Sequence, residues 1–285
     1  MRCRLILLLL SVALLLSACA SVTPPQELPN EPPTAEVPDE PTCAQLSQAW
    51  FLSGEAGDEL ALSLLSRPAD ELRALLDTLY PAERAALGAL LRRAWGAEAF
   101  HAQLNDAPTT LTADELADAQ AFCSSGVVQQ CFLLTLFDDV RNIDLGALMR
   151  YAPAAYQGEP ESAEEWQAFY AAAEGTDWAD GGGMPLCRYT RADVDALLSS
   201  CTAYTAADLR YCEEALYVPE YDAWYAYVSD IDWGTFRAVE GERWGEVLFL
   251  LGDSESEGEN LRDRLLTLLC TDKGYQLIAF AACPL

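Results

Sequence analysis

Basic side chains are scarce in this sequence, which has one histidine, His101, and one lysine, Lys273, among its 285 residues. Metal sites built from several histidines are therefore excluded, and a Ser-His-Asp or Cys-His catalyst would have to use His101. We predict a helix-end or surface position for that histidine instead. The sequence also lacks G-x-S-x-G, S-x-x-K, H-E-x-x-H and phosphate-loop motifs, so we assign no catalytic residue.

Negative charge dominates the composition. Asp and Glu number 45 against 17 Lys and Arg, which gives a formal net charge of −28. Such a chain repels nucleic acid and anionic lipid headgroups, so we expect no nucleic-acid partner and no direct binding of the body to a membrane surface. A solvated acidic surface is the simplest interpretation, and attraction of cations or basic partners is the alternative.

Long apolar runs are absent except at the N-terminus, where Leu5–Leu16 follows Arg2 and Arg4. A charged start and a short apolar core are typical of a secretory signal, and the run is too short to span a bilayer. It ends in Leu16-Ser17-Ala18-Cys19, which resembles the lipobox of bacterial lipoproteins. The resemblance implies a signal peptide over residues 1–18, cleavage before Cys19, and lipid (palmitate included) on Cys19. The body would then be exported and anchored to the membrane from outside the cytoplasm.

Composition and the positions of proline and glycine divide the sequence into four regions. After the signal, residues 19–42 hold the lipidated cysteine and a tether rich in proline and acids, which cannot bury enough surface to fold. Residues 43–107 are predicted to form a small helical domain, in which Pro68 and Pro81 begin helices and Gly96 ends the second. Residues 108–285 are predicted to form a larger α+β domain.

Helix starts in residues 108–285 are marked by capping boxes, in which a hydroxyl is followed three residues later by an acid. The pairs are Thr112 with Glu115, Ser162 with Glu165, Thr190 with Asp193, and Thr205 with Asp208. Asn142 is predicted to cap a further short helix that ends before Pro153.

From about Cys212 the pattern changes to strands. We expect strands over Thr235–Glu240 and Arg243–Leu251 and a hairpin over Arg264–Cys283, with a turn that ends at Gly274. In that hairpin Leu268 faces Ile278 and Leu266 faces Phe280. The predicted fold class is α+β: an N-terminal helical hairpin or bundle, then capped helices, then a C-terminal antiparallel β-meander.

Ten cysteines are present, without a Cys-x-x-Cys pair, so zinc-ribbon and thioredoxin-type sites are disfavoured. Disulfides and small buried thiols both remain open for the eight cysteines after Cys19. The predicted hairpin register keeps Cys270 and Cys283 from bonding each other.

The second half carries another resemblance. The segments Cys131–Tyr151, Tyr189–Leu209 and Leu216–Asp230 are similar to a pattern in uncharacterised exported proteins of Gram-positive anaerobes. That group has no assigned activity, so the resemblance implies a boundary near residue 110 and no chemistry.

The most distinctive binding candidate is the aromatic stretch Tyr211–Trp233. On a strand, Tyr221, Tyr225 and Tyr227 share one face and Trp224 lies on the other, with Asp230 close by in sequence. One row must pack in the core, and the other would offer an aromatic platform for sugar rings or a protein partner. Burial of both faces is the alternative.

A weak calcium site is the one cofactor that the sequence suggests. Asp253, Glu255 and Glu257 alternate before Gly258, as in the front half of a calcium loop. Arg264 stands where that loop needs a glutamate, which excludes an EF-hand and favours a solvated loop.

We therefore expect a lipid-anchored cell-surface protein whose role is non-catalytic binding of a protein, glycan or solute outside the membrane. One alternative is an extracytoplasmic, glycosidase-like hydrolase that uses paired carboxylates. Another is a structural or assembly lipoprotein without a small ligand.

Overall fold

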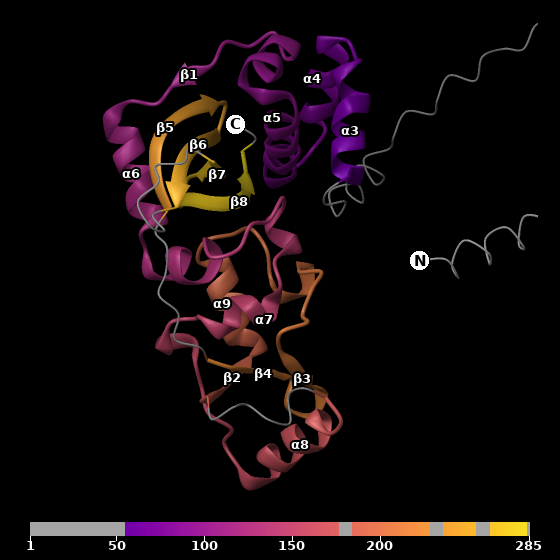
Figure 1. Ribbon diagram of the computed structural model, residues 1–285, viewed down its shortest axis with the longest axis vertical. Coiled ribbons are helices and arrows are strands. Elements are labelled where there is room, and N and C mark those ends of the chain that lie inside the picture. Colours follow the sequence, from indigo (N-terminus) through magenta and orange to yellow (C-terminus); the bar gives the residue numbers. More distant parts are fainter. Residues whose placement is uncertain (1–54, 177–183, 229–235, 255–262, 284–285) are drawn as a thin grey trace, which may run out of the picture. The chain divides into compact units, whose positions relative to one another are not determined.

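The larger sheet of the protein is antiparallel and comes from the C-terminal end of the chain (Figure 1). The computed structural model describes residues 55–176, 184–228, 236–254 and 263–283. The strand order is β1-β5-β6-β7-β8, and the short β1 (Thr109–Thr110) pairs with β5. The other four strands follow one another as a meander: β5 (Phe236–Trp244), β6 (Val247–Ser254), β7 (Arg264–Thr271) and β8 (Gly274–Ala282). The predicted terminal meander is confirmed.

The first strand boundary differs from the prediction, which placed a break at Gly241. Strand β5 continues through Gly241 to Trp244, and the turn falls at Gly245 and Glu246. The reason is packing, because a Cβ at Gly241 would lie 2.6 Å from Cδ1 of Leu111. This glycine therefore admits a neighbouring side chain within a strand and does not mark a turn.

The register of the last hairpin is partly as predicted. Leu266 lies opposite Phe280, which confirms that pair, but Leu268 lies opposite Leu277 and not Ile278. A β-bulge between Thr267 and Leu268 shifts the pairing by one residue. The turn therefore contains only Asp272 and Lys273 before Gly274, whose φ is 115°.

Both faces of this sheet are buried. On β6, Val247 and Phe249 face a core shared with the N-terminal helices, whereas Leu248 and Leu250 face a second core. Figure 1 shows helix α5 on one side of the sheet and helix α6 on the other. The alternation of side chains along a strand explains why β6 is apolar throughout.

The N-terminal helices are α3 (Glu55–Leu65), α4 (Ala69–Asp77) and α5 (Pro81–Gln103). Pro68 precedes α4 and Pro81 begins α5, as predicted. Gly96 does not end α5: the backbone kinks there, at φ 76°, and turns as a helix again up to Gln103. A left-handed φ suits glycine, so the residue interrupts the helix without stopping the chain's helical path.

These helices do not enclose a core of their own. Leu87 and Leu91 of α5 belong to one buried cluster with Phe249, Leu265 and Ile278 of the sheet. Residues 41–285 cluster as one compact unit. Independent folding of residues 43–107 therefore stays a prediction.

Helices α6 (Ala113–Cys123), α7 (Leu145–Arg150) and α9 (Arg191–Ser199) surround the second core, with a π-helical turn at Val128–Phe132 and 3₁₀ turns at Val140–Asn142, Ala154–Tyr156 and Ala206–Asp208. The capping boxes begin as predicted at Thr112, Thr190 and Thr205. The cap predicted at Asn142 is wrong, because the side chain of Asp144 accepts the hydrogen bond from the Ala147 amide.

A smaller antiparallel sheet has the order β2-β4-β3 and packs against helix α8 (Ala163–Ala173). Its strands are β2 (Leu186–Thr190), β3 (Leu216–Val218) and β4 (Ala223–Tyr227). A 3₁₀ turn at Pro219–Tyr221 joins β3 to β4. The α+β class predicted from the sequence is confirmed, although β2 was not predicted.

Six cysteines in the described ranges form no disulfide: Cys123, Cys131, Cys187, Cys201, Cys212 and Cys270. Burial raises the pKa of the Cys123 and Cys201 thiols to about 12. Within the same ranges, none of the helices combines the length and apolar character needed to cross a bilayer.

Candidate functional site

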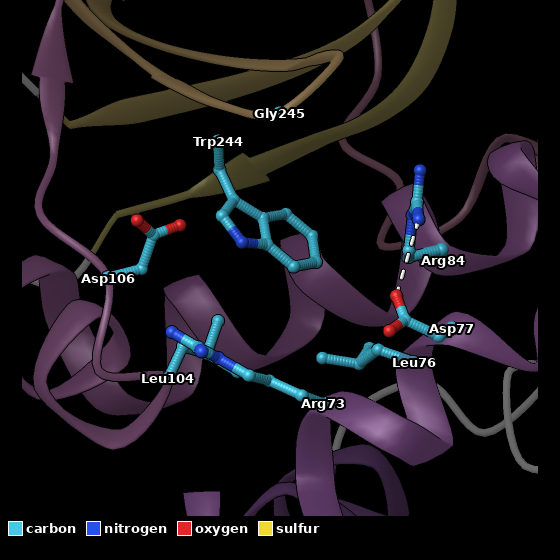
Figure 2. Close-up of a pocket in the computed structure, with 8 residues that line it drawn as sticks. All are labelled: Arg73, Leu76, Asp77, Arg84, Leu104, Asp106, Trp244 and Gly245. Atoms are coloured by element: carbon cyan, nitrogen blue, oxygen red, sulfur yellow. Dashed lines mark ion pairs between the residues drawn. The ribbon is translucent and has the colours of Figure 1, made fainter. Parts of the chain in front are cut away.

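The candidate site is a pocket of about 280 Å³ between α4, α5 and the β5–β6 hairpin (Figure 2). Its apolar floor includes Leu76 and Leu104, and Gly245 lies at the hairpin turn. Its remaining lining is aromatic or charged and comes from segments far apart in the chain: Arg73, Asp77, Arg84, Asp106 and Trp244. We refer to this site as the Trp244 pocket.

Trp244 is placed by its last position on β5 and by aromatic packing. Its ring meets Phe100 edge to face at 5.3 Å and stacks near Phe249 at 6.4 Å. On α5, Gly88 makes room for it, since a Cβ there would lie 2.5 Å from Cζ3 of the indole. The part of the ring away from these contacts lines the pocket, so the tryptophan is both anchored and available.

The indole nitrogen is unused. Within the described residues, the N–H of Trp244 makes no hydrogen bond. Figure 2 shows the nitrogen on the side of Asp106, with Arg84 on the opposite side of the ring. The pocket therefore offers an aromatic face beside a donor that no described group satisfies.

The charged groups of the pocket are also loosely held. Arg84 is 3.7 Å from Asp77 and 3.9 Å from Glu246, both beyond hydrogen-bond distance. Arg73 donates one bond, of 2.6 Å, to the carbonyl of Asn105, which leaves its other N–H groups open. The carboxylate of Asp106 has no partner among the described residues.

Apart from His101 and Glu242, at 3.4 Å, the other ion pairs among the described residues lie at hydrogen-bond distance. Arg141 reaches Asp139 at 2.6 Å, and Arg243 reaches Glu115 at 2.9 Å. Against this background, the open pairs of the Trp244 pocket are unusual for this chain. They leave donors and acceptors free to bind a polar ligand without breaking an internal bond.

A second hollow, of about 700 Å³, adjoins the Trp244 pocket at Asp106. It is lined by Glu98, His101 and Asn105. Of the two positions predicted for His101, the helix end is confirmed, because the residue lies in the last turn of α5, but the side chain is buried and not on the surface. Its Nε2 lies 3.4 Å from Oε2 of Glu242. The other carboxylate oxygen of Glu242, Oε1, pairs with Arg92 at 2.5 Å.

The aromatic platform predicted on β4 is not exposed. Tyr225 is fully buried and Trp224 is 7% exposed. Tyr221 lies outside the strand in the preceding 3₁₀ turn, so it does not share a strand face with Tyr227. Both faces of β4 are covered, by α8 and by the second core, and this is the alternative that the sequence left open.

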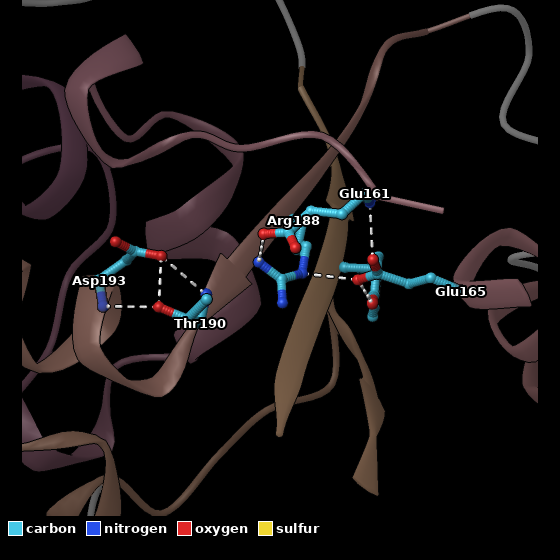
Figure 3. A network of polar contacts seen from close by, with 6 residues as sticks. Glu161, Glu165, Arg188, Thr190 and Asp193 are labelled. Atoms are coloured by element: carbon cyan, nitrogen blue, oxygen red, sulfur yellow. Dashed lines mark hydrogen bonds and ion pairs between the residues drawn. The ribbon is translucent and has the colours of Figure 1, made fainter. Parts of the chain in front are cut away.

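A buried network replaces the platform (Figure 3). The hydroxyl of Tyr225 donates to the carboxylate of Glu165, which is 2% exposed, and the amide of Glu161 donates to the other oxygen at 2.7 Å. Arg188 pairs with Glu165 at 2.6 Å and with Glu161 at 3.2 Å. Burial acts to raise the pKa of Glu165, but the bonds from Tyr225 and Glu161 and the charge of Arg188 lower it overall.

The predicted calcium site is represented only by Asp253. Asp253 is buried near the end of β6, and its carboxylate pairs with Arg237 at 3.0 Å. Glu255 and Glu257 lie outside the described residues, as do Asp230 and Cys19. In the part of the chain that is described, no group of three or more His, Cys, Asp or Glu side chains could hold a metal ion.

Sequence reasoning missed the Trp244 pocket. Arg73 and Trp244 are far apart in the chain, and charged residues on helices α4 and α5 have the pattern of an ordinary solvated face. The available signal was a tryptophan directly before a glycine, which places a large ring at the end of a hairpin strand.

No family model matches the chain, and neither a curated protein nor a solved structure matches it. The lipobox and the likeness of the second half therefore stay predictions from the sequence.

Proposed function

We propose that this protein is an exported, lipid-anchored binding protein whose Trp244 pocket holds a small polar ligand, either a solute or one end of a glycan. The observation that carries the proposal is the open set of donors and acceptors around a partly buried indole that lines the pocket. Sugars and similar solutes are bound by an aromatic face with polar groups at its edge.

In this proposal, lipid on Cys19 anchors the protein to the membrane, and the domain that carries the pocket lies outside the cytoplasm. A test is to compare the native chain with Cys19→Ala in the host cell. We expect the native chain in the membrane fraction with the mass of added lipid, and the variant released without it. A variant that stays in the membrane with unchanged mass would refute the anchor.

Binding is tested by thermal unfolding with a panel of neutral, acidic and amino sugars, amino acids and cell-wall fragments. A ligand at one hundred times its Kd stabilises the folded state by about 2.7 kcal/mol, which raises the melting temperature clearly. We expect the shift to disappear in Trp244→Ala. As a matched control, Trp95→Ala removes an indole that lies on α5 but does not line the pocket, so its shift should persist.

Two outcomes would contradict the binding proposal. A shift that survives Trp244→Ala would place the ligand elsewhere. If no compound shifts the melting temperature of the native chain, the structural or assembly role becomes the better hypothesis.

A second candidate function is glycoside hydrolysis, favoured by the presence of two carboxylates, Asp77 and Asp106, in the same pocket. The same glycan panel tests it through release of reducing ends. Hydrolysis that is lost in both Asp77→Asn and Asp106→Asn would support the enzyme, and binding without product would support the binding protein.

A further inference from the structure

Helix α8 carries an aromatic pair on its outer surface. Trp166 and Tyr170 stack with ring centroids 5.8 Å apart and planes at 25°, and Tyr170 is 55% exposed. Phe169 and Ala173 bury the adjoining side of the helix, and Trp166 packs partly against their cluster. Tyr170 therefore presents its ring to solvent, stacked on an indole that is itself partly buried.

The four-residue spacing continues to an acid. Trp166, Tyr170 and Glu174 follow one another at intervals of four, which places them along one face of the helix. Glu174 is exposed at the end of α8. We define these three residues as the α8 surface.

The buried network of Figure 3 holds this helix in place. Glu165 lies next to Trp166 in the chain and is tied to β4 through Tyr225 and to β2 through Arg188. The aromatic pair thus stands on a helix that is pinned to the smaller sheet. A pre-positioned pair loses little freedom when a partner binds.

The surroundings of the α8 surface are negative. Helix α8 contains no Lys or Arg, and Glu164 is exposed in its first turn. Partial burial, followed by the charges of Glu220, Glu165 and Glu164, raises the pKa of the neighbouring Tyr221. The nearby guanidinium of Arg188 is already committed to Glu165 and Glu161.

We propose that the α8 surface binds an arginine- or lysine-bearing segment of another protein. An aromatic face attracts a guanidinium or ammonium group, and an adjacent carboxylate adds a charge-assisted hydrogen bond. A second copy of this chain is a poor occupant, because it carries the same net charge of −28. Nucleic acid and anionic lipid are disfavoured for the same reason.

The test uses the full-length chain in detergent and a fluorescent peptide of alternating arginine and glycine. Because the whole protein is acidic, some attraction is general, so the informative quantity is the change in Kd between variants at physiological salt. Tyr170→Ala should weaken binding about threefold, as expected for the loss of one cation–π contact. Tyr170→Phe keeps the ring and should bind like the native chain.

A matched control is Tyr80→Ala. Tyr80 is also an exposed tyrosine, at 78%, but it precedes α5 and is remote in sequence from α8. It should leave the Kd of the peptide unchanged. Melting temperatures of all variants, measured alongside, should match the native value because both sites are exposed.

The proposal fails if Tyr170→Ala and Tyr80→Ala bind the peptide equally well, since attraction would then be general. It also fails if the peptide does not bind but a glycan does, with an affinity that Tyr170→Ala lowers. The peptide result does not bear on the Trp244 pocket, which is tested with small ligands and a different variant, whereas a glycan bound at α8 would also count against that pocket as the glycan site.

Discussion

The hydroxyl of Tyr225 donates a hydrogen bond to the buried carboxylate of Glu165, which lies 60 residues earlier in the chain. This single contact ties helix α8 to the central strand of the smaller sheet. It also converts a tyrosine of the predicted binding row into a structural residue. A buried carboxylate is tolerated here because Tyr225, Arg188 and the Glu161 amide all interact with it.

The first prediction concerns acid stability. The pKa of Glu165 is lowered in the folded state. Its charged form therefore stabilises the fold above the ordinary glutamate pKa, and this stability is lost as the pH falls through the lower folded value. Glu165→Gln should reduce the free energy of unfolding by about 2 kcal/mol at pH 7 and flatten its decline below about pH 4.5.

Urea unfolding between pH 3 and 7 measures this effect. Glu164→Gln is the control, because its side chain is exposed on the same helix turn. If both variants follow the native pH profile, the network contributes no pH-dependent stability.

The second prediction concerns the packing of the Trp244 ring against Gly88. Gly88→Ala places a Cβ 2.5 Å from Cζ3 of the indole, so the ring must shift. We expect a loss of about 1–3 kcal/mol in the free energy of unfolding, as for other overpacked sites. Gly126→Ala is the control: its Cβ would meet nothing within 4 Å and its φ is not positive, so the change should be neutral or stabilising. Equal effects of the two variants would contradict the tight contact.

The third prediction concerns thiol reactivity. Cys212 is exposed as a residue, but the atoms packed around its thiol withhold water from it. This desolvation, with a smaller contribution from the charge of Asp144, raises the pKa of the Cys212 thiol to about 11. About one such thiol in a thousand is ionised at pH 8, so iodoacetamide should label it slowly. Cys123 and Cys201 should react more slowly still, because they are buried as well.

Mass spectrometry after timed alkylation gives the rate at each cysteine. In urea the rates should converge, because the folded environments are lost. Fast labelling of Cys201 in the native protein would show that the second core opens readily.

The fourth prediction concerns the boundary near residue 107. Because α5 shares a core with β6, β7 and β8, separately expressed fragments 43–107 and 108–285 should bind each other when mixed. Circular dichroism and gel filtration would detect regained helix and a complex. Two fragments that are each fully folded and do not associate would instead support independent domains.

Local signals in the sequence succeeded where neighbouring residues decide the outcome. Pro68, Pro81 and Thr112 mark helix starts in the structure because proline geometry and a capping hydroxyl act within one turn. The same logic failed at Asn142, where Asp144 supplied the cap two residues later. Several nearby side chains can cap a short helix, and tertiary packing selects one of them.

Contacts between distant segments account for the remaining errors. Gly241 resembles a turn residue until Leu111 is seen packing against it, and His101 resembles a surface histidine until α5 is placed on the sheet. Tyr225 has the same periodicity whether its row faces solvent or a helix. Period alone does not reveal what covers a face.

Composition and short-range pattern were enough to predict the α+β class, the helix starts at Pro68, Pro81 and Thr112, the order of the terminal strands and the excess of acidic residues. Each depends on composition or on residues a few positions apart. Only the tertiary structure decided that Tyr225 is buried and that Trp244 meets Arg73, Arg84 and Asp106 in one pocket. These facts depend on which remote segments pack together, and that choice is made by the burial of the whole core.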